Sequence, residues 1–307
     1  MRAAALSVSI LLPLVAVGAT RHGTWALART DDPAKVQFAL RTSSGGHESS
    51  NSSDWYRSQF SGLDWTTPTK HDVHFQIARD AGTIECDGFL KDGEGAGLFD
   101  FNANGPYEHE MQALGYGPWP DDKLFAAAVH DVSLSFAREM KASGLEGLTP
   151  DKLIAFRIFG INRQFIQEMR SAGITENDSD KLVAFRIHGV TPQFVRELDA
   201  VGVKTRDADK LIAFRIHGVT PQFVRELHTA SVDTHDPDKL IAFRIHGVTP
   251  EYVRAIEKLG FRSPGSDQLI AMRIHGVTPD YIQTLQSRGM HDLTLEQLVA
   301  LRIQGID

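Results

Sequence analysis

One phrase recurs four times in the second half of this 307-residue chain and constrains its fold more than any other feature. It reads DKLVAFRIHGVTPQFVREL, DKLIAFRIHGVTPQFVREL, DKLIAFRIHGVTPEYVRAI and DQLIAMRIHGVTPDYIQTL, and successive copies are 29 residues apart. Its arginine occurs six times without insertion or deletion, at Arg157, Arg186, Arg215, Arg244, Arg273 and Arg302. A constant period of this length is typical of stacked structural repeats.

Each unit carries signals for two helices. The first helix is preceded by an N-cap position, occupied by Thr149, Asp178, Asp207, Asp236, Gly265 and Thr294. It ends at a glycine that tolerates the left-handed conformation, at Gly160, Gly189, Gly218, Gly247, Gly276 and Gly305. A second N-cap position follows, held by Asn162, Thr191, Thr220, Thr249 and Thr278. Side chains that accept hydrogen bonds from free amides begin helices, and glycine ends them. The pattern predicts an α-solenoid of helix-turn-helix units.

The array is predicted to span residues 105–307. Its repeats cover about 149–307, and two incomplete matches over about 105–148 form a divergent cap. Terminal units diverge because they must cover the exposed end of a shared core.

The preceding segment, residues 34–104, alternates apolar and polar side chains and predicts antiparallel strands. Val36, Phe38 and Leu40 share one face, and glycine-containing turns separate such runs. The polar tract 47–54 is predicted as a turn-prone loop, with the aromatic side chains Trp55, Tyr56, Phe60 and Trp65 clamping it to the sheet. The predicted fold class is α+β, a small antiparallel domain followed by the helical array.

Residues 1–19 have the composition of a signal peptide, with an early Arg2, an apolar stretch and small residues up to Ala19. An uncleaved membrane anchor is the alternative. Residues 20–33 are predicted as a linker. The chain is expected to be periplasmic or secreted, and Cys86, its sole cysteine, has no partner for an intramolecular disulfide.

The first helix of each unit is predicted to be a core helix because Leu182, Val183, Ala184, Phe185 and Ile187 leave little polar surface. An arginine in such a helix needs partners, because an unpaired buried charge is costly. Those partners are the Glu168, Glu197 and Glu226 column, the aspartates at the next helix start, or C-terminal carbonyls. The alternative is a ladder facing a groove and binding carboxylates or phosphates, made of Arg157, Arg186, Arg215, Arg244 and Arg273.

A histidine column occupies the last turn of the first helices, at His188, His217, His246 and His275. These imidazoles are candidates for groove residues or for helix capping. Equivalent helices pack roughly 10 Å apart, so one zinc ion cannot gather the column. Side chains at His47, Glu48, Asp54, His71 and His74 lack the close spacing of known metal sites. No metal or cofactor is predicted.

Known catalytic motifs are absent from the sequence, including His-Glu-x-x-His, Gly-x-Ser-x-Gly, the Walker loop and the dinucleotide fingerprint. The formal charge of −7 disfavours nucleic-acid binding. A non-enzymatic protein is therefore expected.

Units built on LIAFRIHGVTP, together with the segment VHFQIARDAGTIECDGFLKDGEGAGLF, resemble the extracytoplasmic extension of bacterial BlaR1/MecR1-type sensors of peptidase family M56. The resemblance covers about residues 34–307. The membrane helices and His-Glu-x-x-His of those peptidases are missing here, so the resemblance implies neither proteolysis nor a zinc ion. It implies a bacterial, envelope-side setting.

The sequence thus predicts a secreted or periplasmic repeat protein that binds a protein or peptide partner through a groove of its array. Repeat arrays present extended surfaces made of equivalent positions. Two alternatives remain. An enzyme or envelope regulator would have its site in the β domain, around Trp55 to His74 and Asp80. Carbohydrate recognition would use the aromatic side chains near Trp55 and Trp65.

Overall fold

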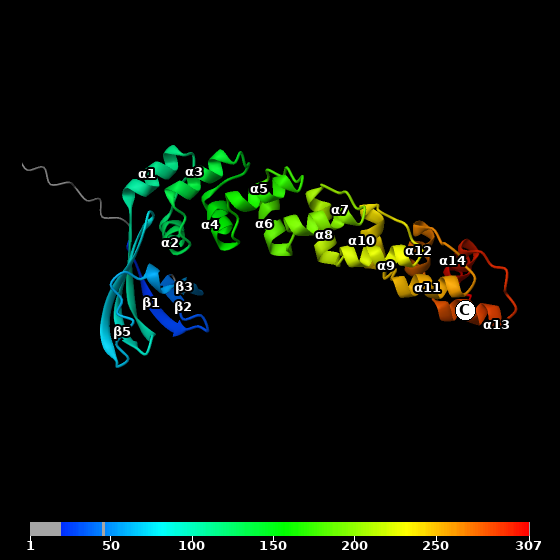
Figure 1. Ribbon diagram of the computed structural model, residues 1–307, viewed down its shortest axis with the longest axis horizontal. Coiled ribbons are helices and arrows are strands. Elements are labelled where there is room, and N and C mark those ends of the chain that lie inside the picture. Colours follow the sequence, from blue (N-terminus) through cyan, green and yellow to red (C-terminus); the bar gives the residue numbers. More distant parts are fainter. Residues whose placement is uncertain (1–19, 45–46, 307) are drawn as a thin grey trace, which may run out of the picture. The chain divides into compact units, whose positions relative to one another are not determined.

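The computed structural model describes residues 20–44 and 47–306 (Figure 1). The predicted signal peptide lies outside the described residues. The predicted fold class is confirmed, because an antiparallel sheet is followed by helical repeats. The chain forms two compact units: the first extends to Ser143 and includes Leu148–Ile158, and the second contains Gly144–Gly147 and the chain from Phe159 onward. The predicted domain boundary at 104/105 is therefore not the boundary between the compact units.

Six antiparallel strands make the sheet of the first unit, in the order β3-β2-β1-β6-β5-β4. Their bounds are β1 Thr20–Arg29, β2 Lys35–Ser44, β3 His47–Tyr56, β4 His71–Arg79, β5 Gly82–Lys91 and β6 Glu94–Ala103. Two three-stranded meanders are joined where β1 pairs with β6. A short 3₁₀ helix, Arg57–Gln59, follows β3.

Two sequence-based assignments in this region were wrong. The linker predicted over residues 20–33 contains β1, and the loop predicted over residues 47–54 belongs to β3. β3 is an edge strand that pairs with β2 along its whole length, from Lys35–Tyr56 to Ser44–His47. Because β2 supplies the backbone hydrogen bonds, β3 can keep polar side chains on its exposed surface.

The core lies on one face of the sheet, to which every second side chain of a strand points, as Val36, Phe38 and Leu40 do in β2. Trp25 is buried there, and its indole Nε1 donates to the Asp87 carbonyl at 3.1 Å. Gly88 and Gly97 are paired across β5 and β6, and a Cβ on Gly97 would lie 2.7 Å from that Nε1. The two glycines thus leave the space that the Trp25 ring occupies.

The tract that the aromatic side chains were predicted to clamp is held by strand pairing with β2, but two of the four aromatic side chains are buried in the core of the sheet. Trp55 and Phe60 are buried and contact Phe38 edge-to-face, at centroid distances of 5.5 and 5.1 Å. Tyr56 is 55% exposed. Trp65 is half-buried, and the Arg57 guanidinium lies 4.9 Å from its centroid.

Four helices complete the first unit: α1 Gly105–Ala113, α2 Asp121–Val129, α3 Leu134–Ala142 and α4 Pro150–Ile158. α2 contacts β5 and β6. Its Phe125 ring stacks on Phe99 with centroids 5.5 Å apart and meets Phe101 edge-on. The divergent cap is thereby packed on the sheet.

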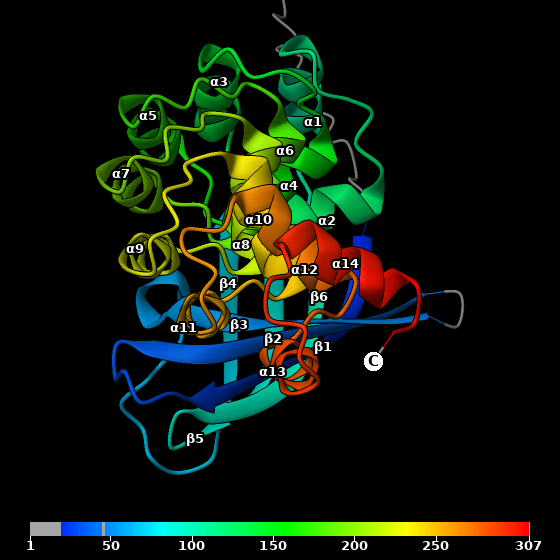
Figure 2. The same cartoon turned by 90° about the vertical axis from the view of Figure 1, so that its right-hand side faces the viewer.

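The second unit consists of paired helices in two rows (Figure 2). One row holds the first helices of the repeats, α6 Ser179–His188, α8 Ala208–His217, α10 Pro237–His246, α12 Ser266–Ile274 and α14 Leu295–Ile303. The other holds α5 Arg163–Ser171, α7 Pro192–Ala200, α9 Pro221–Thr229, α11 Pro250–Lys258 and α13 Pro279–Ser287. Each helix contacts its equivalent one repeat away, which is the arrangement of an α-solenoid.

The predicted helix starts are confirmed by hydrogen bonds. Asp178, Asp207 and Asp236 accept from backbone amides of the first helices, and Thr191 and Thr220 do the same for second helices. Such caps satisfy amides that have no partner within the helix.

Candidate binding surface

The arginine column joins each repeat to the one before it. In the second unit, Nε of Arg186, Arg215, Arg244 and Arg273 donates to the backbone carbonyl 27 residues earlier, at 2.7–3.2 Å. The same guanidinium carbons lie 4.7–4.9 Å from the centroid of the Phe or Tyr ring in the preceding second helix. Within the first unit, Arg157 makes the equivalent contacts with the His130 carbonyl and the Phe136 ring.

Of the three predicted partners for these arginines, the C-terminal carbonyls are the ones observed. The glutamate column accepts hydrogen bonds from glutamines four residues earlier, as in Gln193–Glu197 at 2.7 Å. The aspartates at helix starts pair with lysines of the preceding repeat, as in Lys181–Asp209 and Lys210–Asp238. The hydrogen bond that Lys181 donates to the Asp209 carboxylate raises the pKa of Lys181. Arginine and lysine thus form two ladders between repeats.

A row of exposed isoleucines runs across the first helices. We call Ile187, Ile216, Ile245, Ile274 and Ile303 the isoleucine ridge; they are 53–61% exposed. The prediction of a core helix was wrong for this column. Leu182 and Phe185 are buried, whereas Ile187 lies on the side of the helix that no neighbour covers. Because exposed apolar patches on a protein are often functional, the isoleucine ridge is a candidate interaction surface.

The histidine column flanks the isoleucine ridge. His188, His217 and His275 are exposed, and His246 is half-buried. The backbone carbonyls of His188, His217 and His246 accept the arginine hydrogen bonds. The backbone of these residues is therefore structural, while the imidazoles are open to a partner together with the neighbouring isoleucines.

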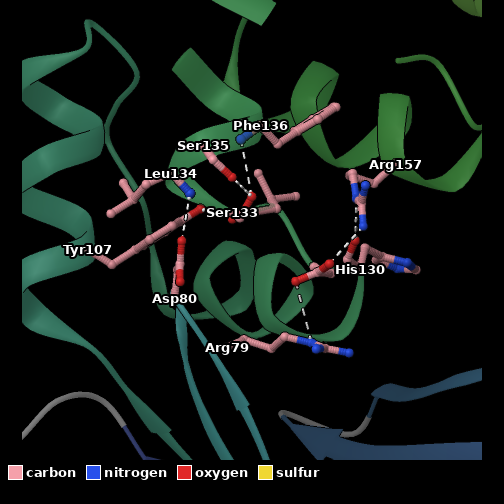
Figure 3. Close-up of polar contacts among 11 residues, drawn as sticks. Arg79, Asp80, Tyr107, His130, Ser133, Leu134, Ser135, Phe136 and Arg157 are labelled. Carbon is pink, nitrogen blue, oxygen red and sulfur yellow. Dashed lines mark hydrogen bonds and ion pairs between the residues drawn. The ribbon is translucent and has the colours of Figure 1, made fainter. Parts of the chain in front are cut away.

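The β-domain candidate Asp80 has a structural role (Figure 3). Its Oδ2 accepts a hydrogen bond from the Leu134 amide at 2.9 Å, at the start of α3. Nearby, the Asp131 carboxylate pairs with Arg157 at 2.8 Å and with Arg79 at 3.5 Å. These contacts hold the turn between β4 and β5 against the end of α2 and the start of α3.

His130 belongs to the same polar region. Burial lowers the pKa of this histidine, and the positive charge of Arg157 lowers it further. The neutral imidazole can accept a hydrogen bond at Nε2 from the Asn51 side-chain amide, 3.2 Å away. His130 therefore joins the edge strand β3 to the end of α2 in its uncharged form.

A wide hollow of about 1010 Å³ lies on the open face of the sheet. His22 and Asp100 form an ion pair at its wall, and Arg41 and Glu48 also line it. The His22 and Asp100 side chains are 73% and 54% exposed. Water competes for such exposed groups, so this pair by itself does not define a catalytic centre.

Comparison of this chain with known protein families, curated proteins and solved structures gave no match. Across residues 20–44 and 47–306, no helix is both long enough and apolar enough to span a bilayer.

Proposed function

We propose that the protein binds a protein or peptide partner on the first-helix face of its repeats. The observation that carries this proposal is the isoleucine ridge, in which one large apolar side chain is exposed in every repeat of the second unit. The surface proposed here is therefore the isoleucine ridge, and not a groove of the array. No catalytic chemistry is needed for this function.

The chemistry of this surface indicates what the partner presents. Equivalent helices pack roughly 8–10 Å apart, so the isoleucines recur at about that interval. An amphipathic helix repeats an apolar side chain every seven residues, or about 10.5 Å. The arginine column next to the isoleucine ridge favours acidic side chains beside those apolar ones. We therefore propose an acidic amphipathic segment as the partner.

A peptide-display selection on the full chain tests this proposal. Selected peptides are expected to bind the wild-type protein and to lose affinity for the triple variant Ile187→Ser, Ile216→Ser, Ile245→Ser. Burial of one isoleucine contributes ~1.5–3 kcal/mol, so the three changes are expected to weaken binding more than ~100-fold. The dissociation constants are measured by fluorescence anisotropy.

The matched control changes Gln193 and Gln222 to serine on the second helices, where both side chains are exposed. Binding is expected to be unchanged in this control. Equal affinity of the peptides for the wild-type protein and the isoleucine triple variant would contradict the proposal.

The cellular setting is a further part of the proposal. The signal-like residues 1–19 and the resemblance to an envelope-side extension support a bacterial periplasmic or secreted protein. N-terminal sequencing of the exported protein is expected to find the chain starting close to residue 20. An intact N-terminus in the membrane fraction would instead support the uncleaved anchor.

A site in the β domain is the second candidate, and the hollow lined by His22, Arg41 and Asp100 supports it. Carbohydrate binding by Trp55 has less support, because that ring is buried among other aromatic side chains. The hollow offers polar groups of both signs and suits a small polar ligand better than a ring-stacking sugar.

A further inference from the structure

The repeat that contains α9 differs from the two repeats before it at the contact between the end of the second helix and the following loop. In the preceding repeat, Asp199 at the end of α7 and Arg206 in the loop form a two-pronged ion pair, with N–O distances of 2.6 and 2.9 Å. One repeat earlier, Arg170 and Asn177 occupy the same positions, and Nη2 donates to Oδ1 at 3.1 Å. In both repeats, complementary side chains fasten the loop to the helix.

The next repeat has histidine at both positions, His228 and His235. Their ring centroids are 4.8 Å apart and the ring planes are tilted by 60°, and the two imidazoles lack the charge complementarity of Asp199 and Arg206. The Asp233 carboxylate lies with them: its Oδ1 is 3.5 Å from His228 Nε2 and 3.6 Å from His235 Nδ1. The potential ligand atoms of the three residues all lie within 4.8 Å of one another.

These separations fit a shared metal ion. Zinc bonds to imidazole nitrogen and carboxylate oxygen are ~2.0–2.2 Å long, which places neighbouring ligands of a tetrahedral ion about 3.4 Å apart. The distances from Asp233 Oδ1 to the two imidazole nitrogens, 3.5 and 3.6 Å, are close to that spacing. All three ligand atoms lie within 4.8 Å of one another, so a small rotation of the side chains brings them around one ion.

Two further observations orient the imidazoles. His228 Nε2 is buried without a hydrogen-bond partner, although buried polar atoms in folded proteins normally have one. His235 packs over Gly202 of the preceding repeat, where an added Cβ would lie 2.5 Å from its Nε2 and Cδ2. That contact turns the Nδ1 edge of His235 toward Asp233.

We propose that His228, Asp233 and His235 bind one late first-row divalent metal ion, with Zn²⁺ as the best fit. Two imidazoles and one carboxylate favour such ions over Mg²⁺ and Ca²⁺, which prefer oxygen ligands. The Asp233 side chain is 84% exposed, so solvent can fill the remaining coordination position. The ion fastens the loop before α10 to the end of α9, as the ion pair does one repeat earlier. This site is independent of partner binding at the isoleucine ridge.

The regular histidine column and the polar side chains between His47 and His74 were considered from the sequence as sources of metal ligands, and this cluster was missed. The available signal was the departure from the repeat, because His228 and His235 stand where the preceding unit has Asp199 and Arg206. Among the five units, only this one has a metal-ligating imidazole at both positions.

Zinc titration of the full chain without an affinity tag, in competition with a chromophoric chelator, tests the proposal. One ion per chain is expected, with micromolar or tighter affinity. The key variant is the double substitution His228→Asp, His235→Arg, which restores the ion pair of the preceding repeat and so preserves the fold. Its zinc affinity is expected to fall by more than the ~10–100-fold that follows loss of an outer-shell partner of a metal site.

Asp233→Asn is expected to weaken zinc binding as well, whereas His291→Ala, at an exposed histidine outside the cluster, leaves it unchanged. Co²⁺ substitution adds a structural readout, because the wild-type protein should give the visible absorption of a tetrahedral ion and the double variant should not. Absence of stoichiometric zinc binding in the wild type would overturn the proposal. So would undiminished binding in the double variant.

Discussion

Replacing Phe214 with alanine is expected to lower the free energy of unfolding of the repeat unit by about 3–5 kcal/mol. Phe214 lies in α8 with no exposed surface, at the position occupied by Phe185 and Phe243 in the neighbouring repeats. The loss combines the transfer of the ring from water with the cavity that remains, since packed helices collapse only partly around it. Urea unfolding of the full chain, followed by circular dichroism, measures the change.

Ile216→Ala, two residues further along the same helix, is the matched control. Its side chain is 56% exposed, so the stability of the variant is expected to stay within about 0.5 kcal/mol of wild type. The pair of variants separates the buried column of the first helix from the isoleucine ridge. A similar loss in both would mean that the isoleucines are part of the core, and the proposed binding surface would not exist.

Gly97→Val is expected to destabilise the first unit by about 3 kcal/mol or more, at the upper end of the cost of overpacking a core. A Cβ at this position would lie 1.9 Å from the Asp87 carbonyl oxygen and 2.7 Å from the Trp25 indole nitrogen. Neither the β5 backbone nor the Trp25 ring can move away without breaking sheet pairing or core packing. Near-ultraviolet circular dichroism of Trp25 and its neighbours, recorded through thermal unfolding, reports the loss.

Leu98→Ala is the control for this position. Leu98 is the next residue of β6 and points to the open face, where it is 67% exposed. Its loss is expected to change stability by no more than about 0.5 kcal/mol. Comparable melting temperatures for Gly97→Val and wild type would show that the space beside Trp25 is larger than the structure indicates.

Local signals predicted the repeat array well. Aspartate, asparagine or threonine before most of the helices and glycine after most of them determine where helices begin and end, and these contacts are made within a few residues. The alternation of Val36, Phe38 and Leu40 likewise identified β2. β3 was missed because its polar side chains carry no alternating pattern, and its pairing depends on β2 rather than on its own sequence.

The candidate binding surface was harder to predict, because exposure depends on which sides of a helix have neighbours. Ile187 and Phe185 are two residues apart and equally apolar, yet only the phenylalanine is covered. The arginine column raised a similar difficulty. Glutamate, aspartate and carbonyl partners were all compatible with the sequence, and only the position of the preceding repeat singles out the carbonyl of Phe159 for Arg186.

The two ladders between repeats also bear on how such a protein evolves. Lys210 pairs with Asp238, 28 residues later, and Arg215 donates to the carbonyl of His188, 27 residues earlier. The neighbouring units carry equivalent groups at the same spacing. Loss or duplication of one complete unit of 29 residues would therefore place two compatible units next to each other. Each new contact between units would have the same donors and acceptors as the original contact. Gene recombination can lengthen or shorten the array by whole units without a redesigned joint, and the isoleucine ridge would gain or lose one isoleucine with each unit.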